Sequence, residues 1–326
     1  MCNHRNQRRY NAGVAIETNI DSWSDGQVGV ARPVNIFQLE KAKPTRPKAD
    51  HPLSTQHCLG LILCDLQEAV LDCRSFWFLS VQMSLVWQVE EVALNVRPSP
   101  VETYQDGWLI RASGGTVRRT NCISPTPYRS DDFTSVLAAG EALYHRLGRP
   151  TIIKILSIGD DVDEMLADRG YTIDAPSQVL LAPDIASRSR SKAVAVETGA
   201  VPADWIEAWM AFGGSPPAGS FLSASLSAIT LPAAYASYRQ KGEIVALAYG
   251  IIHRGILGID AVATRPDARG RGLAGQVVSS LQNWAHQNKA TSACLSVLAD
   301  NPAAHALYRR TGFVRHLYDY HYRLRD

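Results

Sequence analysis

The sequence predicts an α+β protein whose strands are mostly antiparallel and whose chain folds as two similar halves. Strand and helix patterns alternate from Val86 onward. The strands expected within 233–263 are joined by tight turns, as in an antiparallel meander. The order helix, strand, short helix, glycine and aromatic residue occurs twice, ending at Leu166–Tyr171 and again at Leu307–Phe313. This repetition, with a spacing of about 141 residues, indicates a tandem duplication.

Composition and charge are those of an ordinary globular protein. The chain has 326 residues, of which 46% are hydrophobic and 20% charged, and its formal net charge is +2. This balance predicts neither a nucleic-acid partner nor a membrane surface, and the apolar stretch Phe76–Trp87 is too short to span a bilayer. The six cysteines include no Cys-x-x-Cys pair. We therefore expect no metal site, no disulfide framework and a cytoplasmic protein with reduced thiols.

The expected domain organisation has four parts. Residues 1–82 are polar and aperiodic over most of their length, and we interpret them as a disordered tail or an over-extended start. A helical extension at 58–82 is the alternative. Residues 83–183 form the first half, residues 184–193 a linker rich in Ser and Arg, and residues 194–326 the second half.

The first half begins with a strand pair expected to turn at Gly114-Gly115. A helix follows, because two aspartates precede an amphipathic pattern that Gly148 closes, and Gly170 closes a shorter helix in the same way. The expected elements are strands Gly107–Ala112 and Val117–Ile123, helix Phe133–Leu147, strand Thr151–Ile158, helix Asp161–Arg169 and strand Tyr171–Leu181.

The second half begins with a helix that carries Trp205 and Trp209 on one face, followed by a glycine- and proline-rich loop. Turns at Lys241-Gly242 and Arg254-Gly255 separate three strands. The expected elements are helix Pro202–Ala211, loop Gly213–Gly219, strands Ala233–Tyr238, Glu243–His253 and Gly255–Ala263, helix Leu273–Gln287, strand Ala293–Val297, helix Pro302–Arg310 and strand Tyr318–Leu324.

The turn Arg269–Gly275, between a strand and an amphipathic helix, is typical of a pyrophosphate site. Its glycines allow close backbone approach, and the first turn of the helix offers unpaired N–H groups. Gly270, Gly272 and Gly275 also match a dinucleotide fingerprint, with Asp300 as its ribose-binding acid. Only 26 residues follow that aspartate, too few for a dinucleotide fold.

A second motif, Asn301 to Phe313, follows the next strand. Asn301 is expected to cap a helix and Pro302 to occupy its first position. Ala304 and Tyr308 lie four residues apart and therefore share a helix face, on which small side chains leave room for a ligand.

Together, Arg269-x-x-Gly272-x-Ala274 and Asn301…Ala304…Tyr308…Gly312-Phe313 resemble the two cofactor motifs of the GNAT superfamily of N-acetyltransferases, most clearly over 244–326. The resemblance implies a mixed sheet flanked by helices, in which two central strands splay apart to admit acetyl-CoA as co-substrate. It places pantetheine on the backbone of Val262, Ala263 and Thr264. It places the pyrophosphate on the N–H groups of residues 270 to 275 and the thioester sulfur near Tyr308. The other cofactor-binding residues that it implies are Arg269, Gly270, Arg271, Gly272, Leu273, Ala274, Gly275, Asn301 and Ala304.

Two residues are the candidates for catalysis. The attacking amine must lose a proton, and Asp260 is the candidate base because burial could raise its pKa. Tyr308 is the candidate acid that protonates the leaving thiolate, and a backbone N–H of Val262–Ala263 is expected to stabilise the oxyanion. His253 is a weaker candidate base, His305 is expected on the surface, and Cys294 in the core.

The acceptor is expected to be a primary amine of a small molecule or peptide. A non-catalytic acyl-CoA-binding module and a dinucleotide-dependent oxidoreductase are the alternatives. The first half has Pro125–Asp132 where the second half has its glycine turn, so we expect it to bind no CoA. Arg118 and Arg119 are interpreted as a solvated strand end. The sequence does not predict the oligomeric state.

Overall fold

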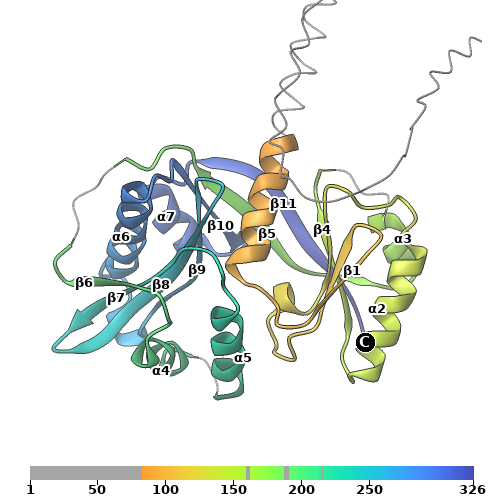
Figure 1. Ribbon diagram of the computed structural model, residues 1–326, viewed down its shortest axis with the longest axis horizontal. Helices are drawn as coiled ribbons and strands as arrows, with labels where there is room; N and C mark the ends of the chain where they lie inside the picture. The colour runs from red at the N-terminus through yellow and green to blue at the C-terminus, as the bar shows by residue number, and fades with distance from the viewer. Residues whose placement is uncertain (1–82, 159–161, 187–190, 214–215) are drawn as a thin grey trace, which may run out of the picture. The chain divides into compact units, whose positions relative to one another are not determined.

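The computed structural model describes residues 83–158, 162–186, 191–213 and 216–326 (Figure 1). These residues belong to one unit of the chain, Leu61–Asp326. The interpretation of residues 1–82 as a tail or extension therefore lies outside the described residues. No helix in the described part of the chain is long and apolar enough to cross a lipid bilayer.

Eleven strands form one mixed, mostly antiparallel sheet in the order β1-β2-β3-β4-β11-β5-β10-β9-β8-β7-β6. The predicted α+β class and the mostly antiparallel pairing are confirmed. The strands are β1 (Glu102–Gln105), β2 (Trp108–Arg111), β3 (Ile123–Pro125), β4 (Thr151–Leu156), β5 (Thr172–Ala182), β6 (Val194–Thr198), β7 (Ala233–Gln240), β8 (Glu243–His253), β9 (Ile256–Thr264), β10 (Ser292–Leu298) and β11 (Arg315–Arg325).

Helices cover both faces of this sheet (Figure 1). In the second half, α6 and α7 pack on one face, and α4 and α5 pack on the other. In the first half, α2 and α3 pack on β2, β3 and β4, while the helix at 83–96 packs where the two halves meet. The bounds are α2 (Thr134–Arg146), α3 (Val162–Asp168), α4 (Ala203–Ala211), α5 (Pro216–Ser227), α6 (Leu273–Gln287) and α7 (Pro302–Arg310).

The two halves exchange their last strands. β11, at the end of the second half, lies between β4 and β5 of the first half and pairs antiparallel with both. The other edge of β5 pairs with β10 of the second half, from Ala182↔Ala293 to Ser177↔Leu298. Each half therefore completes its sheet with a strand from the other. The tandem duplication and the boundaries at 183 and 194 stay predictions.

The sheet opens at one place, between the parallel strands β9 and β10. Their register runs only from Ile256↔Ser292 to Gly258↔Cys294, and beyond these pairs the described parts of the two strands no longer pair. Gly258 also faces the helix at 83–96, since a Cβ there would lie 2.6 Å from Val92 Cγ1. The wedge expected from the GNAT resemblance is thus present in the sheet.

Three local predictions were wrong. The expected strand Val117–Ile123 contains a short 3-10 helix, η1 (Arg118–Thr120), and only its last residue enters β3. The first hairpin turns at Asp106-Gly107 and not at Gly114-Gly115, with Gln105 opposite Trp108. The loop predicted at 213–219 contains the start of α5, because a proline is tolerated in the first helical turn, where its missing N–H is not needed.

Candidate active site

A cavity of about 640 Å³ lies where β9 and β10 part, bounded by the turn before α6 and by one side of α7. Its volume falls in the range of small-molecule sites, about 300–1,000 Å³. The cofactor-site residues predicted from the sequence all line it: Val262, Ala263, Thr264, Arg269, Gly270, Arg271, Gly272, Leu273, Ala274, Gly275, Asn301, Ala304 and Tyr308. The fold thus gathers these residues around one space, while their contact with a ligand stays a prediction.

The glycine turn has the backbone of an anion cradle. Gly270 and Gly272 both have a φ of 74°, a conformation that side chains with a Cβ rarely adopt. Gly272 is the N-cap of α6 and supplies no side-chain cap, so the first N–H groups of the helix have no side-chain acceptor. Leu273 is buried against the sheet and fixes the helix start. These amides, at the positive end of the helix dipole, suit a phosphate group.

Two arginines flank this cradle. The Nε atom of Arg269 donates to the carbonyl oxygen of Thr264 at 3.3 Å, which ties the turn to the end of β9. Arg271 is exposed at the cavity and adds positive charge. A phosphate-bearing ligand therefore meets both backbone donors and guanidinium groups on this side of the cavity.

The second wall of the cavity is α7, which begins as predicted. The side-chain oxygen of Asn301 accepts the Ala304 N–H at 3.0 Å, and Pro302 occupies the first turn. Gly312, with a φ of 96°, ends the helix and turns the chain toward Phe313. This capping holds Ala304 and Tyr308 toward the cavity.

Tyr308 brings a phenol group to the wall of the cavity. Its side chain is buried and packs edge-on against Phe313, with the ring centroids 5.9 Å apart. Burial, reinforced by the charge of Asp260, raises the pKa of Tyr308 to about 12. Its hydroxyl has no hydrogen-bond partner among the described residues. A phenol of this kind is protonated at neutral pH and free to donate into the cavity.

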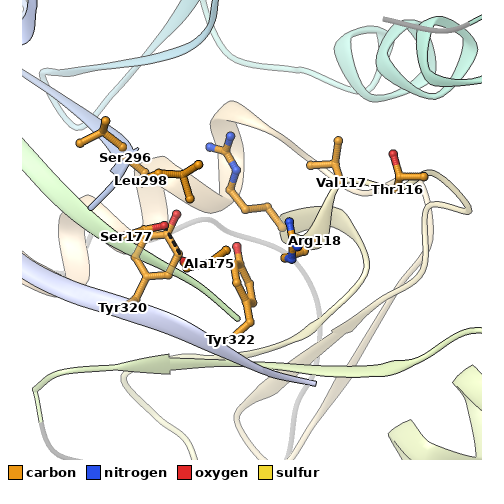
Figure 2. A pocket seen from close by; sticks show the side chains of 11 residues that line it. Thr116, Val117, Arg118, Ala175, Ser177, Ser296, Leu298, Tyr320 and Tyr322 are labelled. Atoms are coloured by element: carbon orange, nitrogen blue, oxygen red, sulfur yellow. Dashed lines mark hydrogen bonds between the residues drawn. The ribbon is translucent and has the colours of Figure 1, made fainter. Parts of the chain in front are cut away.

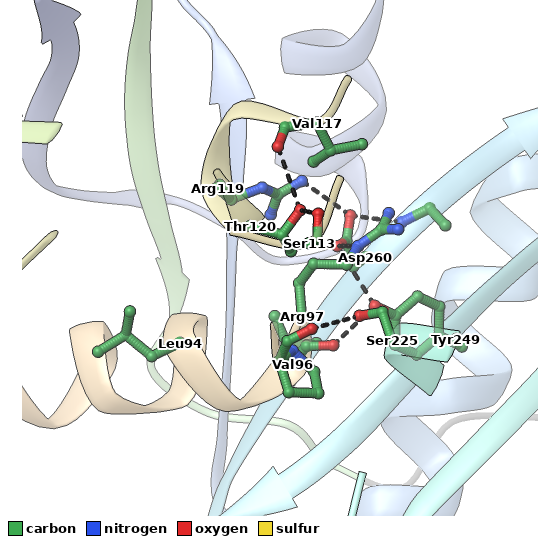
Figure 3. A network of polar contacts seen from close by, with 12 residues as sticks. Leu94, Val96, Arg97, Ser113, Val117, Arg119, Thr120, Ser225, Tyr249 and Asp260 are labelled. Atoms are coloured by element: carbon green, nitrogen blue, oxygen red, sulfur yellow. Dashed lines mark hydrogen bonds and ion pairs between the residues drawn. The ribbon is translucent and has the colours of Figure 1, made fainter. Parts of the chain in front are cut away.

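Asp260 differs from its predicted role as a base. Its carboxylate accepts Arg97 Nε at 2.9 Å, a terminal amino group of Arg119 at 3.0 Å and the Ala261 N–H at 2.6 Å (Figure 3). Burial alone would raise the pKa of Asp260, but the two guanidinium groups and the N–H outweigh it and lower the pKa well below its usual range. The expectation of a raised pKa was wrong, and a carboxylate held so firmly in its charged form is a poor proton acceptor.

The polar cluster around Asp260 supports a bulge in β9. Ala261 has a φ of 52°, and the register with β8 shifts between Leu247 and Tyr249. The Tyr249 hydroxyl donates to the Val96 carbonyl oxygen at 2.7 Å, which ties β8 to the end of the helix at 83–96. The bulge directly precedes the residues of β9 that line the cavity, so the cluster sets their direction.

The other candidate residues lie outside the cavity. The His253 ring contacts Glu91 at 2.8 Å, and the ring of His305 contacts the Leu298 carbonyl oxygen at 3.1 Å. Cys294 is buried as expected, and burial raises the pKa of its thiol to about 12. None of these three side chains lines the cavity at the glycine turn within the described structure.

Arg118 is exposed, as its interpretation as part of a solvated strand end expected, but both arginines lie in η1 and Arg119 is partly buried. Arg119 reaches from η1 into the second half and binds Asp260, and Arg118 pairs with Asp174 of β5. No local pattern predicts the contact of Arg119 with Asp260, because 141 residues separate the two. The same holds for Arg97, which lies 163 residues from Asp260.

The alternative of a dinucleotide site does not fit this fold. The strands that lead to the glycine turn, β6 to β9, pair antiparallel in sequence order. A dinucleotide-binding fold needs a parallel sheet with crossover helices around its fingerprint.

Comparison with known proteins gives several acetyltransferase matches. A family model described as "Probable histone acetyltransferase Rv0428c C-terminal" matches residues 84–323. The chain is 25% identical over 253 residues to the "Uncharacterized N-acetyltransferase YobR" of Bacillus subtilis (strain 168), which covers 74% of this chain and 100% of that protein. A GCN5-related N-acetyltransferase from Kribbella flavida superposes with a TM-score of 0.54 at 17% identity, covering 74% and 94% of the two chains. One from Sphaerobacter thermophilus has a TM-score of 0.47 at 20% identity, with 62% and 72% covered.

Proposed function

The chain belongs to the family of the C-terminal region of a probable histone acetyltransferase, within the GNAT superfamily, and we propose that it transfers an acetyl group from acetyl-CoA to a primary amine. The observation that carries this proposal is the cavity at the β9–β10 wedge. It is lined both by a phosphate cradle and by a protonated tyrosine, which suits the pyrophosphate and the thioester of acetyl-CoA.

The residues present fit that molecule. The N–H groups of Gly270 to Gly275 would hold the pyrophosphate, and the backbone of Val262 to Thr264 would bind the pantetheine arm. Open space beside Gly270 and Gly272 leaves room for the phosphates, because an added Cβ at either residue would meet nothing within 4 Å. Acetyl-CoA supplies an activated acyl group, so no covalent enzyme intermediate is needed.

The side chains and backbone then have two tasks. A backbone N–H of Val262 or Ala263, next to the bulge, would donate to the oxygen that gains negative charge when the amine attacks; one such donor contributes roughly 3 kcal/mol. The C–S bond breaks, and Tyr308 would give its proton to the departing sulfur. The attacking nitrogen carries a positive charge after the C–N bond forms. It gives its extra proton to the Tyr308 phenolate, which leaves a neutral amide and returns the protein to its starting state.

Asp260 has no proton-transfer step in this proposal. Its carboxylate is held by Arg97 and Arg119 and keeps the bulge in place. The amine must therefore bind in its neutral form, and the surroundings of the acceptor must favour that form over the ammonium.

The proposal is tested with the purified full chain in two measurements. We expect acetyl-CoA to raise the thermal unfolding midpoint and NAD to leave it unchanged. We also expect free thiol to be released from acetyl-CoA only when a primary amine from a panel is present. Binding of acetyl-CoA without thiol release for any amine would favour a non-catalytic acyl-CoA-binding module.

The number of bound molecules tests the role of the first half. The segment between β3 and α2 has prolines in place of a glycine turn. We therefore expect titration calorimetry to give one acetyl-CoA per chain. Two molecules per chain would contradict this assignment.

A further inference from the structure

A second cavity, of about 320 Å³, borders the same end of β10 as the cavity at the glycine turn. Ser296, Val297 and Leu298 line both spaces. The other walls of the second cavity come from η1 with the residues before it, from β5 and from β11, and none of these segments lines the first cavity. Both cavities therefore border the end of β10.

Two tyrosine hydroxyls face this second cavity without a hydrogen-bond partner in the described part of the chain. Tyr320 and Tyr322 stand on the same face of β11 and rise into the cavity (Figure 2). They are only 5% and 3% exposed, yet neither hydroxyl has a hydrogen-bond partner among the described residues. Tyr318, on the same face, instead donates to Glu90. The two hydroxyls are therefore available to bond a polar group that enters the cavity.

The charge of this cavity is positive. Arg118 and Arg119 line it, and none of its described lining residues is acidic. Behind the lining, Asp174 pairs with Arg118, and Asp260 pairs with both Arg119 and Arg97. Three guanidinium groups therefore face two carboxylates, which leaves one positive charge in excess. Lys154 adds none, because its ammonium is paired with Glu90.

Arg118 is the guanidinium of this cavity that a ligand can reach most readily. Only its Nε atom donates to Asp174, and its two terminal amino groups have no hydrogen-bond partner in the described part of the chain. Its side chain is 43% exposed, so a ligand entering from solvent can reach it. A guanidinium with two free amino groups binds carboxylates with matched geometry.

We propose that the second cavity is the acceptor site and that the acceptor is a small primary amine that also carries a carboxylate group. This inference rests on the proposed acetyl transfer. Arg118 binds the carboxylate, the hydroxyls of Tyr320 and Tyr322 hydrogen-bond the polar part of the acceptor, and the amine lies toward Ser296, which lines both cavities. The volume, near the lower end of the range for small-molecule sites, suits a small acceptor.

The excess positive charge of the second cavity also favours a neutral amine, so that no side chain has to act as a base. An ammonium group that enters a cavity with excess positive charge loses stability relative to the neutral amine, so its pKa falls. The carboxylate of the acceptor is attracted by Arg118, while the amine beside Arg119 is held in the form that can attack. A polyamine or a lysine-rich peptide has no group to offset this repulsion.

The test compares an acceptor that carries a carboxylate with its uncharged amide, and with two acceptors of other classes. Acetyl transfer by the full chain is followed by thiol release with 4-aminobutyrate, its amide 4-aminobutanamide, a diamine and a lysine-rich peptide. We expect kcat/KM for the acid to exceed that for the amide by about tenfold or more. Arg118→Gln should raise KM for the acid, leave kcat within about twofold and remove the preference, and Arg118→Lys should restore part of it.

The matched control is Arg146→Gln, the same change at an exposed arginine of α2 outside this cavity, which should leave the preference intact. Tyr322→Phe provides a second variant and should also raise KM for the acid. Equal use of acid and amide, or a preference for the diamine or the peptide, would overturn the acceptor class while acetyl transfer stands. Acetyl-CoA binding without thiol release for all four acceptors would overturn the proposed transfer itself.

Discussion

Replacing Asp260 with asparagine separates the two roles this residue could have. If Asp260 anchors the bulge in β9, the substitution leaves Arg97 and Arg119 without their counter-charge in a buried setting. The side chains of Arg97 and Asp260 are 6% and 8% exposed, and that of Arg119 is 25% exposed. If Asp260 were instead the base, its loss would chiefly affect turnover.

The structure sets the size of the expected effect on folding. Removing one partner of a buried ion pair costs about 3–5 kcal/mol, and the partial exposure of Arg119 places this case near the lower limit. For a domain of this size, each kcal/mol shifts the unfolding midpoint by about 2–4 °C. We therefore expect Asp260→Asn to lower the midpoint by roughly 10 °C. The control Asp267→Asn, at an exposed carboxylate paired with Arg265, should leave the midpoint unchanged.

Two further measurements sharpen this prediction. In Arg119→Met/Asp260→Asn the loss should be smaller than the sum of the single losses, because the two residues interact directly. The folded-state pKa of Asp260 lies below its unfolded value. The stabilisation is therefore complete above the ordinary aspartate pKa of about 3.9 and is lost only as pH falls through the lowered folded-state pKa. A variant with an unchanged midpoint, a kcat reduced a hundredfold and no acidic limb in its pH–rate profile would refute the anchoring role.

Three other predictions concern the cavity at the glycine turn and the exchanged strands. Tyr308→Phe should lower kcat by about a hundredfold and leave the affinity for acetyl-CoA unchanged. The wild-type rate should not fall up to about pH 10, because the pKa of Tyr308 is raised to about 12. An unchanged kcat in the variant, when chemistry limits turnover, would remove Tyr308 from the mechanism. Gly272→Ala and its control Gly255→Ala place the same side chain at φ values of 74° and 72°, with open space around both. Each variant should therefore lose about 1–2 kcal/mol of folding stability. Calorimetry should find weaker acetyl-CoA binding only in Gly272→Ala. Because β5 and β11 are exchanged, fragments 83–186 and 191–326 should each fail to unfold cooperatively when expressed alone. The two fragments should co-purify when they are expressed together. Two fragments that fold independently would contradict the strand exchange.

Local chemistry made the elements around the glycine turn predictable. The bounds of α6 and α7 agree with the sequence prediction at both ends, Leu273–Gln287 and Pro302–Arg310. In each case the signal is contained within one helix: a glycine turn before an amphipathic stripe, or an asparagine cap followed by proline. The predicted cofactor residues meet around one cavity because they all lie on these helices, on the turn or on the adjoining end of β9.

The charged neighbours of that cavity were not predictable in the same way. Burial of Asp260 was anticipated, but the sign of its pKa shift depends on two arginines that arrive from distant parts of the sequence. Arg119 was misjudged because η1 was expected to be a strand, and a strand end would have pointed its side chain to solvent. Contacts of this kind follow from the sheet topology, and no sequence period or cap encodes them.

The strand exchange gives the first half a role that needs no glycine turn of its own. β5 from the first half supports the edge of β10, whose end borders both cavities. Arg97 and Arg119 hold the bulge of β9, and Arg118 supplies charge to the second cavity. If the second cavity is the acceptor site, the first half contributes to that site without a glycine turn. On this argument a substitution in η1 should alter the choice of amine, whereas one in the turn before α6 should alter the affinity for acetyl-CoA.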